Sequence, residues 1–315
     1  MILVTGGAGF IGSHTVRALL DAGEDCVIPK HQEVRDATFF EDELGKRIFI
    51  ERVDLSKKAE LLALGDKYDI TGIVHLAAPG LGGTFTDDLR NHVTLLANVL
   101  DAAEAWGVKR ITFASALGVY AGIAELPWRE DAPLSLMAPA PIIALKKISE
   151  ITANFVNMSD KVECVALRIA AVFGPLQNPV VTVANRLAHA AATGTPVQLE
   201  GTMFTTYAQE GFDYCYVKDV ARGIALLQTA DKLNHRIYNV ASGHATTNQA
   251  VADAVKALRP DLKISLPGGQ DPHGIGLVPA MDITRLREDT GYKPRFRIPG
   301  AMEDYIAWLQ AGHRQ

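Results

Sequence analysis

Short apolar runs alternate with longer amphipathic stretches over much of the chain. Continuous apolar runs are typical of strands covered on both faces of a sheet, and apolar positions at helical spacing predict amphipathic helices. Strands are expected at residues 2–6, 26–28, 47–54, 72–78, 110–115 and 163–174, and helices at 11–23, at 92–107 and from near Ala144. This alternation indicates an α/β fold with a parallel sheet and helices on both faces.

The pattern loosens after Gly174, where prolines and glycines separate short helical pieces. A strand followed by a helix is expected at residues 213–230, a strand at 237–242, a helix at 248–258 and a final helix ending near Gln310. We therefore expect two parts. A sheet domain is formed by residues 1–172, with residues 213–242 returning to it, and a smaller lobe lies within residues 173–315.

Composition excludes some classes of partner. The net charge of the 315 residues is −5, without a basic block, so neither nucleic acid nor an anionic membrane is expected. Cys26, Cys164 and Cys215 are far apart and lack the spacing of metal ligands, which predicts buried thiols in a reducing compartment and no metal site. The chain shows no basic leader and no apolar run of membrane-spanning length, so a cytoplasmic location is expected.

Three glycines, Gly6, Gly9 and Gly12, lie between the first expected strand and the first expected helix. In a phosphate-binding turn the first permits a tight bend, the second lets the backbone approach a pyrophosphate, and the third lets the helix pack on the strand. The first helical residues, including Phe10 and Ile11, then present free N–H groups to the phosphates. The glycines follow a strand and open a helix, so the sequence predicts dinucleotide binding.

With the motif HLAA at residues 75–78, the chain resembles the extended short-chain dehydrogenase/reductase family, the NAD-dependent epimerase/dehydratases. Further marks of the family run nearly from end to end: Asp54-Leu55, ITFASALGVY (111–120), Lys146 with Glu150, LRIAAVFGP (167–175), YVKDVARG (216–223) and GYKPRF (291–296). The resemblance implies a Rossmann-type doubly wound parallel sheet, a C-terminal lobe for a small-molecule substrate, and NAD(P)-dependent oxidoreductase or epimerase activity. It also implies a homodimer formed through a four-helix bundle.

The resemblance assigns cofactor contacts outside the glycine turn. Asp54 is expected to accept a hydrogen bond from the adenine amine, with Leu55 beside the ring. Leu76, Ala77 and Ala78 are expected to line the passage toward the nicotinamide, although these positions also suit ordinary strand core. The dinucleotide would then lie across the carboxyl ends of the strands.

The end of the second expected strand bears on which dinucleotide is bound. Family members that use NAD usually carry an acidic residue there, which holds the adenosine ribose. Here Lys30 occupies that position, with His31 next to it. A cation removes the carboxylate and can pair with a 2′-phosphate, so NADP is favoured slightly over NAD, with a solvated loop lysine as the alternative.

The family's chemistry normally uses a tyrosine four residues before the lysine that is Lys146 here. That lysine binds the nicotinamide ribose and lowers the pKa of the phenol, which then passes protons while hydride moves. Aligned without gaps, the tyrosine position holds Ile142, and the usual serine or threonine position holds Ala116, with Ser115 beside it. The asparagine position of the preceding helix holds His92. We therefore consider Lys146, Ser115 and His92 as catalytic candidates with atypical proton handling.

Two more family positions concern the substrate. Nucleotide-sugar enzymes generally hold the diphosphate with an asparagine and an arginine, at positions that are Ala171 and Phe212 here. A desolvated diphosphate without a cation is costly. Together with Ala116 and Ile142, these residues predict a small and rather apolar substrate that is not a nucleotide sugar.

Several alternatives stay open. Arg186 or Arg222 is an alternative cation for an anionic substrate, and Tyr120, Tyr207 or Tyr214 is an alternative proton donor. The intact cofactor motifs favour an enzyme with altered chemistry. The missing tyrosine and serine motivate a second hypothesis, a non-catalytic dinucleotide-binding sensor or scaffold protein.

Overall fold

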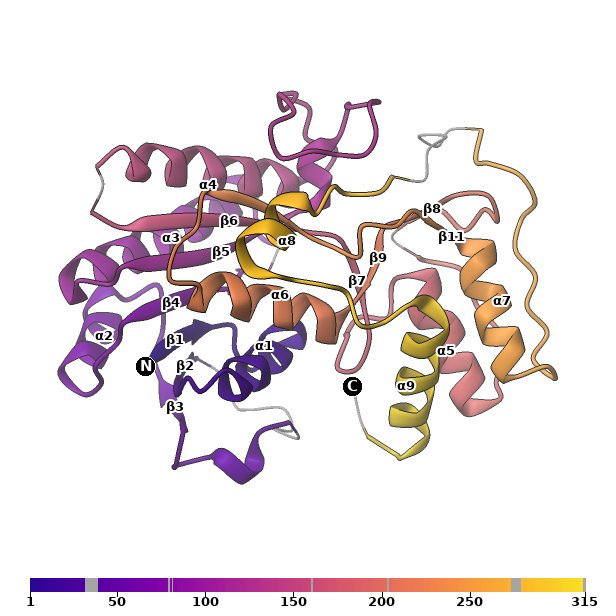
Figure 1. Ribbon diagram of the computed structural model, residues 1–315, viewed down its shortest axis with the longest axis horizontal. Coiled ribbons are helices and arrows are strands. Elements are labelled where there is room, and N and C mark those ends of the chain that lie inside the picture. The colour runs from indigo at the N-terminus through magenta and orange to yellow at the C-terminus, as the bar shows by residue number, and fades with distance from the viewer. Residues whose placement is uncertain are drawn as a thin grey trace.

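Seven parallel strands form the central layer of the protein, in the order β10-β6-β5-β4-β1-β2-β3 (Figure 1). The computed structural model describes residues 1–31, 39–78, 80, 82–159, 161–202, 204–272 and 279–313. The strands are β1 (Ile2–Thr5), β2 (Cys26–Lys30), β3 (Ile48–Arg52), β4 (Gly72–His75), β5 (Arg110–Ala116), β6 (Glu163–Ile169) and β10 (Ile237–Val240). The expected doubly wound parallel sheet is confirmed.

Helices cover both faces of this sheet because its strands are apolar on both sides. Ile2 and Val4 face a core cluster that includes residues of α1 (Phe10–Asp21) and α6 (Val217–Thr229). Leu3 faces a second cluster, with α3 (Phe85–Trp106) and α4 (Pro141–Asn157). The helix α2 (Lys58–Leu62) and the short 3-10 turns η1 (Glu41–Glu43), η2 (Ala63–Asp66) and η3 (Leu117–Tyr120) complete this part.

The remaining elements form a smaller group (right in Figure 1). It contains α5 (Val183–Thr193), α7 (Asn248–Leu258) and α9 (Ile298–Gln310), which pack against one another around a third core cluster. Two small sheets join it, β7 (Ala171–Phe173) with β9 (Tyr214–Tyr216), and β8 (Gly211–Phe212) with β11 (Thr246–Thr247). The domain limits given above stay a prediction, although α6 and β10 do belong to the layers of the sheet.

Three expected limits of elements were wrong. The helix expected at residues 92–107 begins at Phe85. The helix expected from Ala144 begins at Pro141, because proline at the first helical position already has the required φ angle. The run 163–174 contains two strands, since β7 leaves the main sheet to pair with β9. The short helices α2 and α8 (Thr284–Thr290) were not expected.

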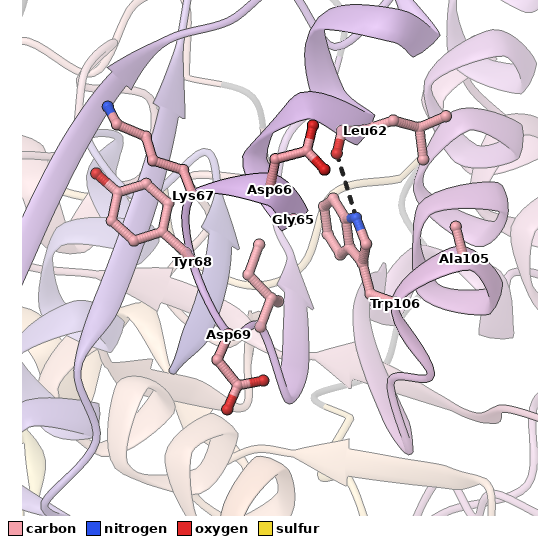
Figure 2. Close-up of a pocket in the computed structure, with 9 residues that line it drawn as sticks. Leu62, Gly65, Asp66, Lys67, Tyr68, Asp69, Ala105 and Trp106 are labelled. Atoms are coloured by element: carbon pink, nitrogen blue, oxygen red, sulfur yellow. Dashed lines mark hydrogen bonds between the residues drawn. The ribbon is translucent and has the colours of Figure 1, made fainter.

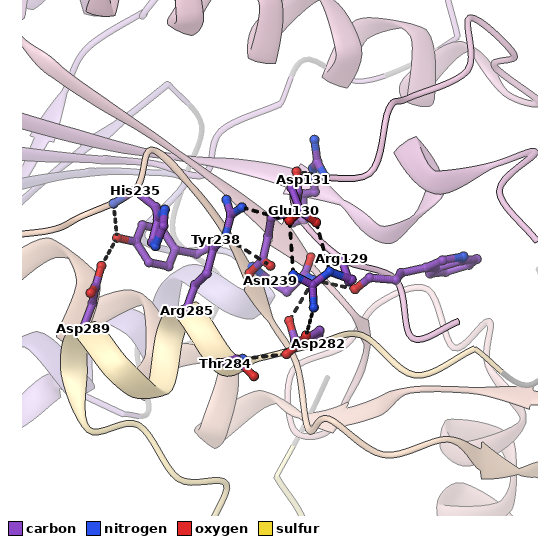
Figure 3. Close-up of polar contacts among 12 residues, drawn as sticks. Arg129, Glu130, Asp131, His235, Tyr238, Asn239, Asp282, Thr284, Arg285 and Asp289 are labelled. Atoms are coloured by element: carbon purple, nitrogen blue, oxygen red, sulfur yellow. Dashed lines mark hydrogen bonds and ion pairs between the residues drawn. The ribbon is translucent and has the colours of Figure 1, made fainter. Parts of the chain in front are cut away.

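A polar cluster fixes the C-terminal segment to the edge of the sheet (Figure 3). Asn239 of β10 donates from Nδ2 to the carbonyl oxygens of Trp128 and Asp282, at 2.9 and 2.8 Å. Its backbone N–H donates to the Glu130 carboxylate at 2.9 Å. Arg129 reaches Asp282 at 3.2 Å. The segment that follows η3 is therefore tied both to β10 and to the chain before α8.

The cysteine side chains lie in the protein interior. Cys26, Cys164 and Cys215 are unpaired and buried, as expected, and burial raises the pKa of the Cys26 and Cys164 thiols to about 12. In the described part of the chain, no helix combines the length and apolar character needed to cross a membrane.

Candidate active site

The backbone segments around the glycine turn lie so close together that side chains on its glycines would occupy the space beside the turn. Gly6 has φ of +71°, a left-handed conformation that favours glycine. A Cβ on Gly12 would lie 1.9 Å from the carbonyl oxygen of Gly6, so helix α1 approaches the turn as closely as its backbone allows. Gly9 is exposed and is the N-cap residue of α1. A Cβ on Gly9 would lie 3.2 Å from the same carbonyl oxygen of Gly6.

The first turn of α1 offers unopposed backbone donors. No side chain caps this helix, and its first turn has no acidic residue. The N–H groups of Phe10, Ile11 and Gly12 have no partner within the helix, because the first turn precedes the first i to i−4 bond. Free N–H groups and the positive end of the helix dipole favour a phosphate. The residues present fit a dinucleotide pyrophosphate.

The adenosine end of the expected site lies where β2 and β3 end. The carbonyl oxygen of Lys30 accepts from the backbone of Val53 at 3.1 Å, so Lys30 is next to the segment that carries Asp54. Asp54 Oδ1 accepts from the Ser56 backbone and hydroxyl at 3.0 and 2.7 Å, and these bonds lower the pKa of the Asp54 carboxyl. Its Oδ2 faces His31 at 4.0 Å.

Leu55 and the chain after β4 complete the expected cofactor positions. The carbonyl oxygen of Leu55 accepts from Asn98 of α3 at 2.8 Å, which fixes the backbone there. The N–H groups of Leu76 and Ala77 donate to the carbonyl and hydroxyl oxygens of Thr5, at 3.1 and 3.3 Å.

The glycine turn touches this segment directly. A Cβ on Gly6 would lie 2.9 Å from the nitrogen of Ala77, so Leu76 and Ala77 are held against the turn, and Ala78 follows them as an exposed residue. The contact brings the two halves of the expected cofactor site together at the carboxyl edge, where β1 and β4 adjoin.

Lys146 is a buried cation in the first half of α4. Burial lowers its pKa to about 8, and within the described chain its Nζ makes no hydrogen bond or ion pair. His92 of α3 and His75 at the end of β4 are its buried electrostatic neighbours. Burial lowers the pKa of His75 to about 3, and burial together with Lys146 lowers that of His92. Both imidazoles are therefore neutral beside the lysine at pH 7.

His92 has a partner that the sequence did not reveal. Its Nε2 lies 2.8 Å from Oγ of Ser149, which stands three residues after Lys146 on α4. Ser149 also donates to the carbonyl oxygen of Leu145 at 3.2 Å. A spacing of three residues places Ser149 and Lys146 on the same side of the helix, and that spacing was the available signal.

Ser115 is not placed to stabilise an oxyanion. Its hydroxyl donates to Glu150 at 2.5 Å, and Glu150 pairs with Arg168, whose Nη2 lies at 2.8 Å. Arg168 also donates to the Tyr120 hydroxyl, which donates to Asn239 at 2.7 Å. The expectation of a catalytic Ser115 is corrected: its side chain belongs to a buried ion-pair network that joins β5, α4 and β6.

The same contacts remove two alternative proton donors. Tyr120 is committed to that network, and burial raises its pKa to about 12. The Tyr214 hydroxyl donates to Asn248 at 2.8 Å, and burial raises its pKa as well. The Tyr207 hydroxyl, by contrast, makes no hydrogen bond in the described chain. Arg222 pairs with Asp219 at 3.4 Å and also donates to the carbonyl oxygen of Lys293.

The positions expected to contact substrate are hydrocarbon. Ile142 in the first turn of α4 and Ala116 at the end of β5 are half-buried. Ala171 and Phe212 are buried in the core cluster of the smaller group. Leu117, directly after Ala116, packs against that cluster and against the sheet cluster. The loop after β5 therefore joins the sheet to the cluster that holds Ala171 and Phe212.

A separate cavity of about 550 Å³ lies elsewhere, between η2 and the end of α3 (Figure 2). Trp106 donates to the carbonyl oxygen of Leu62 at 3.4 Å across it, and a Cβ on Gly65 would collide with the same indole. The cavity includes Ile70, just before β4, and so opens at the amino ends of the strands. It is not part of the site at the carboxyl edge.

Comparison with known proteins gives a consistent result. A family model described as "NAD dependent epimerase/dehydratase family" matches residues 2–241. The UDP-glucose 4-epimerase of Lacticaseibacillus casei is 28% identical, over 94% of this chain and 92% of that protein. These matches confirm the family resemblance drawn from the sequence motifs, and with it the expected enzyme class.

Solved structures agree. The Thermus thermophilus UDP-glucose 4-epimerase in complex with NAD has a TM-score of 0.77 at 25% identity, with 99% of both chains covered. The Thermotoga maritima UDP-glucose 4-epimerase with UDP-glucose has a TM-score of 0.79 at 20% identity, again over 99% of both chains, which supports the fold.

The buried lysine predicts a specific pH dependence of stability. The folded pKa of about 8 lies below the ordinary 10.5, so the unfolded chain binds more protons between these values and stability rises with pH there. Lys146→Met removes this term. The variant should exceed the wild type in free energy of unfolding at pH 7, and the excess should shrink by about 3 kcal/mol by pH 10.5.

Urea unfolding at a series of pH values measures this difference. Lys109→Met, which removes an exposed lysine, should leave the pH dependence unchanged. An unfolding difference between wild type and Lys146→Met that is constant with pH would show that Lys146 is not desolvated.

Proposed function

The chain belongs to the NAD dependent epimerase/dehydratase family, and on this premise we propose an NAD(P)-dependent oxidoreductase or epimerase with a changed proton donor. Its substrate is small, partly apolar and not a nucleotide sugar. One observation carries the proposal: the cofactor cradle is complete, while the positions around Lys146 that normally handle protons hold Ile142 and Ala116.

The cofactor roles follow from the donors present. The turn at Gly6, Gly9 and Gly12 and the first N–H groups of α1 bind the pyrophosphate. Lys146 binds the nicotinamide ribose, and Asp54 binds the adenine amine. When bound, the nicotinamide gives or takes hydride. Relatives are solved with NAD. Lys30 at the end of β2 supports NADP, because its charge suits a 2′-phosphate.

Lys146 and His92 replace the missing phenol. Because position 142 is an isoleucine, no hydroxyl lies one helical turn before Lys146. Burial leaves the Lys146 ammonium with a pKa of about 8. An acid whose pKa lies near neutral is an efficient donor to a developing alkoxide. Neutral His92, whose Nε2 is hydrogen-bonded to Ser149, accepts a proton from Lys146 or returns one to it.

The substrate proposal rests on charge. The positions of Ala171 and Phe212 offer no cation, and Arg222 is held by Asp219. A diphosphate brought against Ala171 and Phe212 would lose its hydration without gaining an ion pair from these two positions. Apolar carbon at Ala116, Ile142 and Phe212 suits a short hydrocarbon instead.

A homodimer is also proposed. Helices α3 and α4 pack side by side, and their outward faces expose large apolar side chains. On α4 and just after it, Ile151, Phe155 and Met158 are 67%, 72% and 78% exposed, and on α3 Val93 is 42% exposed. Ile151, Phe155 and Met158 follow one another at helical spacing, so they lie on one side of the helix. An exposed apolar face of this kind indicates a protein interface, and two such helix pairs form a four-helix bundle.

The cofactor proposal predicts a preference that depends on Lys30. Wild-type protein should bind both reduced cofactors, NADPH more tightly, when titrated by cofactor fluorescence. Lys30→Asp should weaken NADPH relative to NADH by about tenfold or more, the loss of one charge-assisted bond. Lys57→Asp, which changes an exposed lysine paired with Glu60, serves as the control. Absence of binding by either cofactor contradicts the proposal.

The proton-transfer proposal predicts that His92→Gln lowers the maximal rate by roughly 10²–10⁴-fold with unchanged cofactor affinity. The assay follows reduced-cofactor absorbance with a panel of small carbonyl compounds and alcohols. Tyr207→Phe should keep the wild-type rate, which separates His92 from the alternative phenol. A wild type that is inert, beside an Ile142→Tyr/Ala116→Ser variant that turns over, would identify a non-catalytic sensor or scaffold instead.

The dimer proposal predicts that Phe155→Glu produces monomers, because a charge cannot be buried unpaired in the bundle. Sedimentation velocity should show dimers for the wild type and for Leu136→Glu, which changes a 95% exposed residue outside the two helices. A monomeric wild type at micromolar concentration excludes this interface.

A further inference from the structure

Glu210 is a deeply buried carboxylate with few partners. It lies just before β8 and is 1% exposed. Its Oε1 accepts one long bond, from the backbone of Asp271 at 3.3 Å. Its Oε2 is buried and has no hydrogen-bond partner among the described residues. A buried carboxylate oxygen without a donor is strongly unfavourable, and the described residues supply none to Oε2.

Two other buried carboxylates, those of Asp213 and Asp219, have several donors. Asp213, 2% exposed, accepts from the backbone of Ser242, Gly243 and Met281 and from the Ser242 hydroxyl. Asp219, 1% exposed, accepts from two backbone N–H groups and pairs with Arg222. Burial alone therefore does not explain why Glu210 has so few donors.

Glu210 lies close along the chain to one of the proposed substrate positions. It directly precedes β8, its backbone carbonyl accepts from the N–H of Asn248 at 2.7 Å, and Phe212 follows two residues later. Phe212 packs on Phe204 with 4.6 Å between ring centroids. Leu117 of the loop after β5 packs against the cluster that contains Phe212. Glu210 thus adjoins, along the chain, the apolar cluster of the smaller group.

We propose that Glu210 binds the ammonium group of a small amine substrate whose hydrocarbon part lies against Phe212. This inference rests on the proposed function and names its substrate class. An ammonium supplies up to three donors and cancels the buried charge, which a neutral hydroxyl does not. A carboxylate or phosphate on the ligand would instead meet a like charge in a desolvated place. An arginine at position 212 would offer the substrate a positive charge, whereas Glu210 offers a negative one.

The test uses three probes of matched length: butylammonium, 1-butanol and butyrate. Calorimetric titration of the protein saturated with reduced cofactor should give butylammonium at least about tenfold tighter binding than either of the others. Glu210→Gln should weaken butylammonium by a similar factor and leave 1-butanol unchanged. Glu200→Gln, which removes an exposed carboxylate from the same lobe, should behave as wild type.

Equal affinity for butyrate or for 1-butanol, or an unchanged butylammonium affinity in Glu210→Gln, overturns the proposal. If Glu210→Gln does not fold, Glu210→Asp takes its place. It keeps the charge but withdraws it by one methylene, and should weaken butylammonium while preserving the preference over butyrate. Because these titrations need no turnover, they separate the two proposals: selective ammonium binding by a protein that never turns over substrate would reject the enzymatic role alone.

Discussion

The close backbone contact between the glycine turn, helix α1 and the chain after β4 is the constraint on which the site depends. Gly12 packs on the carbonyl of Gly6, and Gly6 packs on Ala77. A single Cβ at either glycine would separate these backbones. The contact aims the first turn of α1 at the place where β1 and β4 adjoin, and it holds Leu76 and Ala77 beside the same place. This one packing contact thus positions both the backbone N–H groups that are expected to bind phosphate and the segment that is expected to lead toward Lys146.

The environment of Lys146 follows from what surrounds that contact. In the usual arrangement a phenol shares the lysine's charge, whereas here the neighbours are Ile142, two neutral imidazoles and the protein interior. A desolvated ammonium is destabilising for the folded chain but gives up its proton more readily. Both effects come from the desolvation of Lys146. The burial that lowers the stability of the folded chain therefore also makes the ammonium more acidic.

Much of the sheet and the cofactor cradle could be predicted because their signals are local. Apolar runs, helical spacing and three glycines lie within a few residues of one another along the chain. The role of Ser115 could not be read in this way. Neighbouring strand residues point in opposite directions, but only the tertiary position of Arg168 and Glu150 decides that Ser115 faces the ion pair and Ala116 does not. The partner of His92 was hidden for the same reason.

Glu210 shows a stronger limit on reading a sequence. Its significance lies in how few donors the described residues offer it, which only the tertiary structure reveals. Asp213, three positions along, has the same residue class and burial yet is saturated by the chain after β10 and by Met281. The described residues thus supply several donors to Asp213 and few to Glu210, and this difference is why we propose a ligand for Glu210. In our proposal Phe212 supplies an apolar wall and Glu210 a negative end, a pairing suited to a short amine and unsuited to a diphosphate.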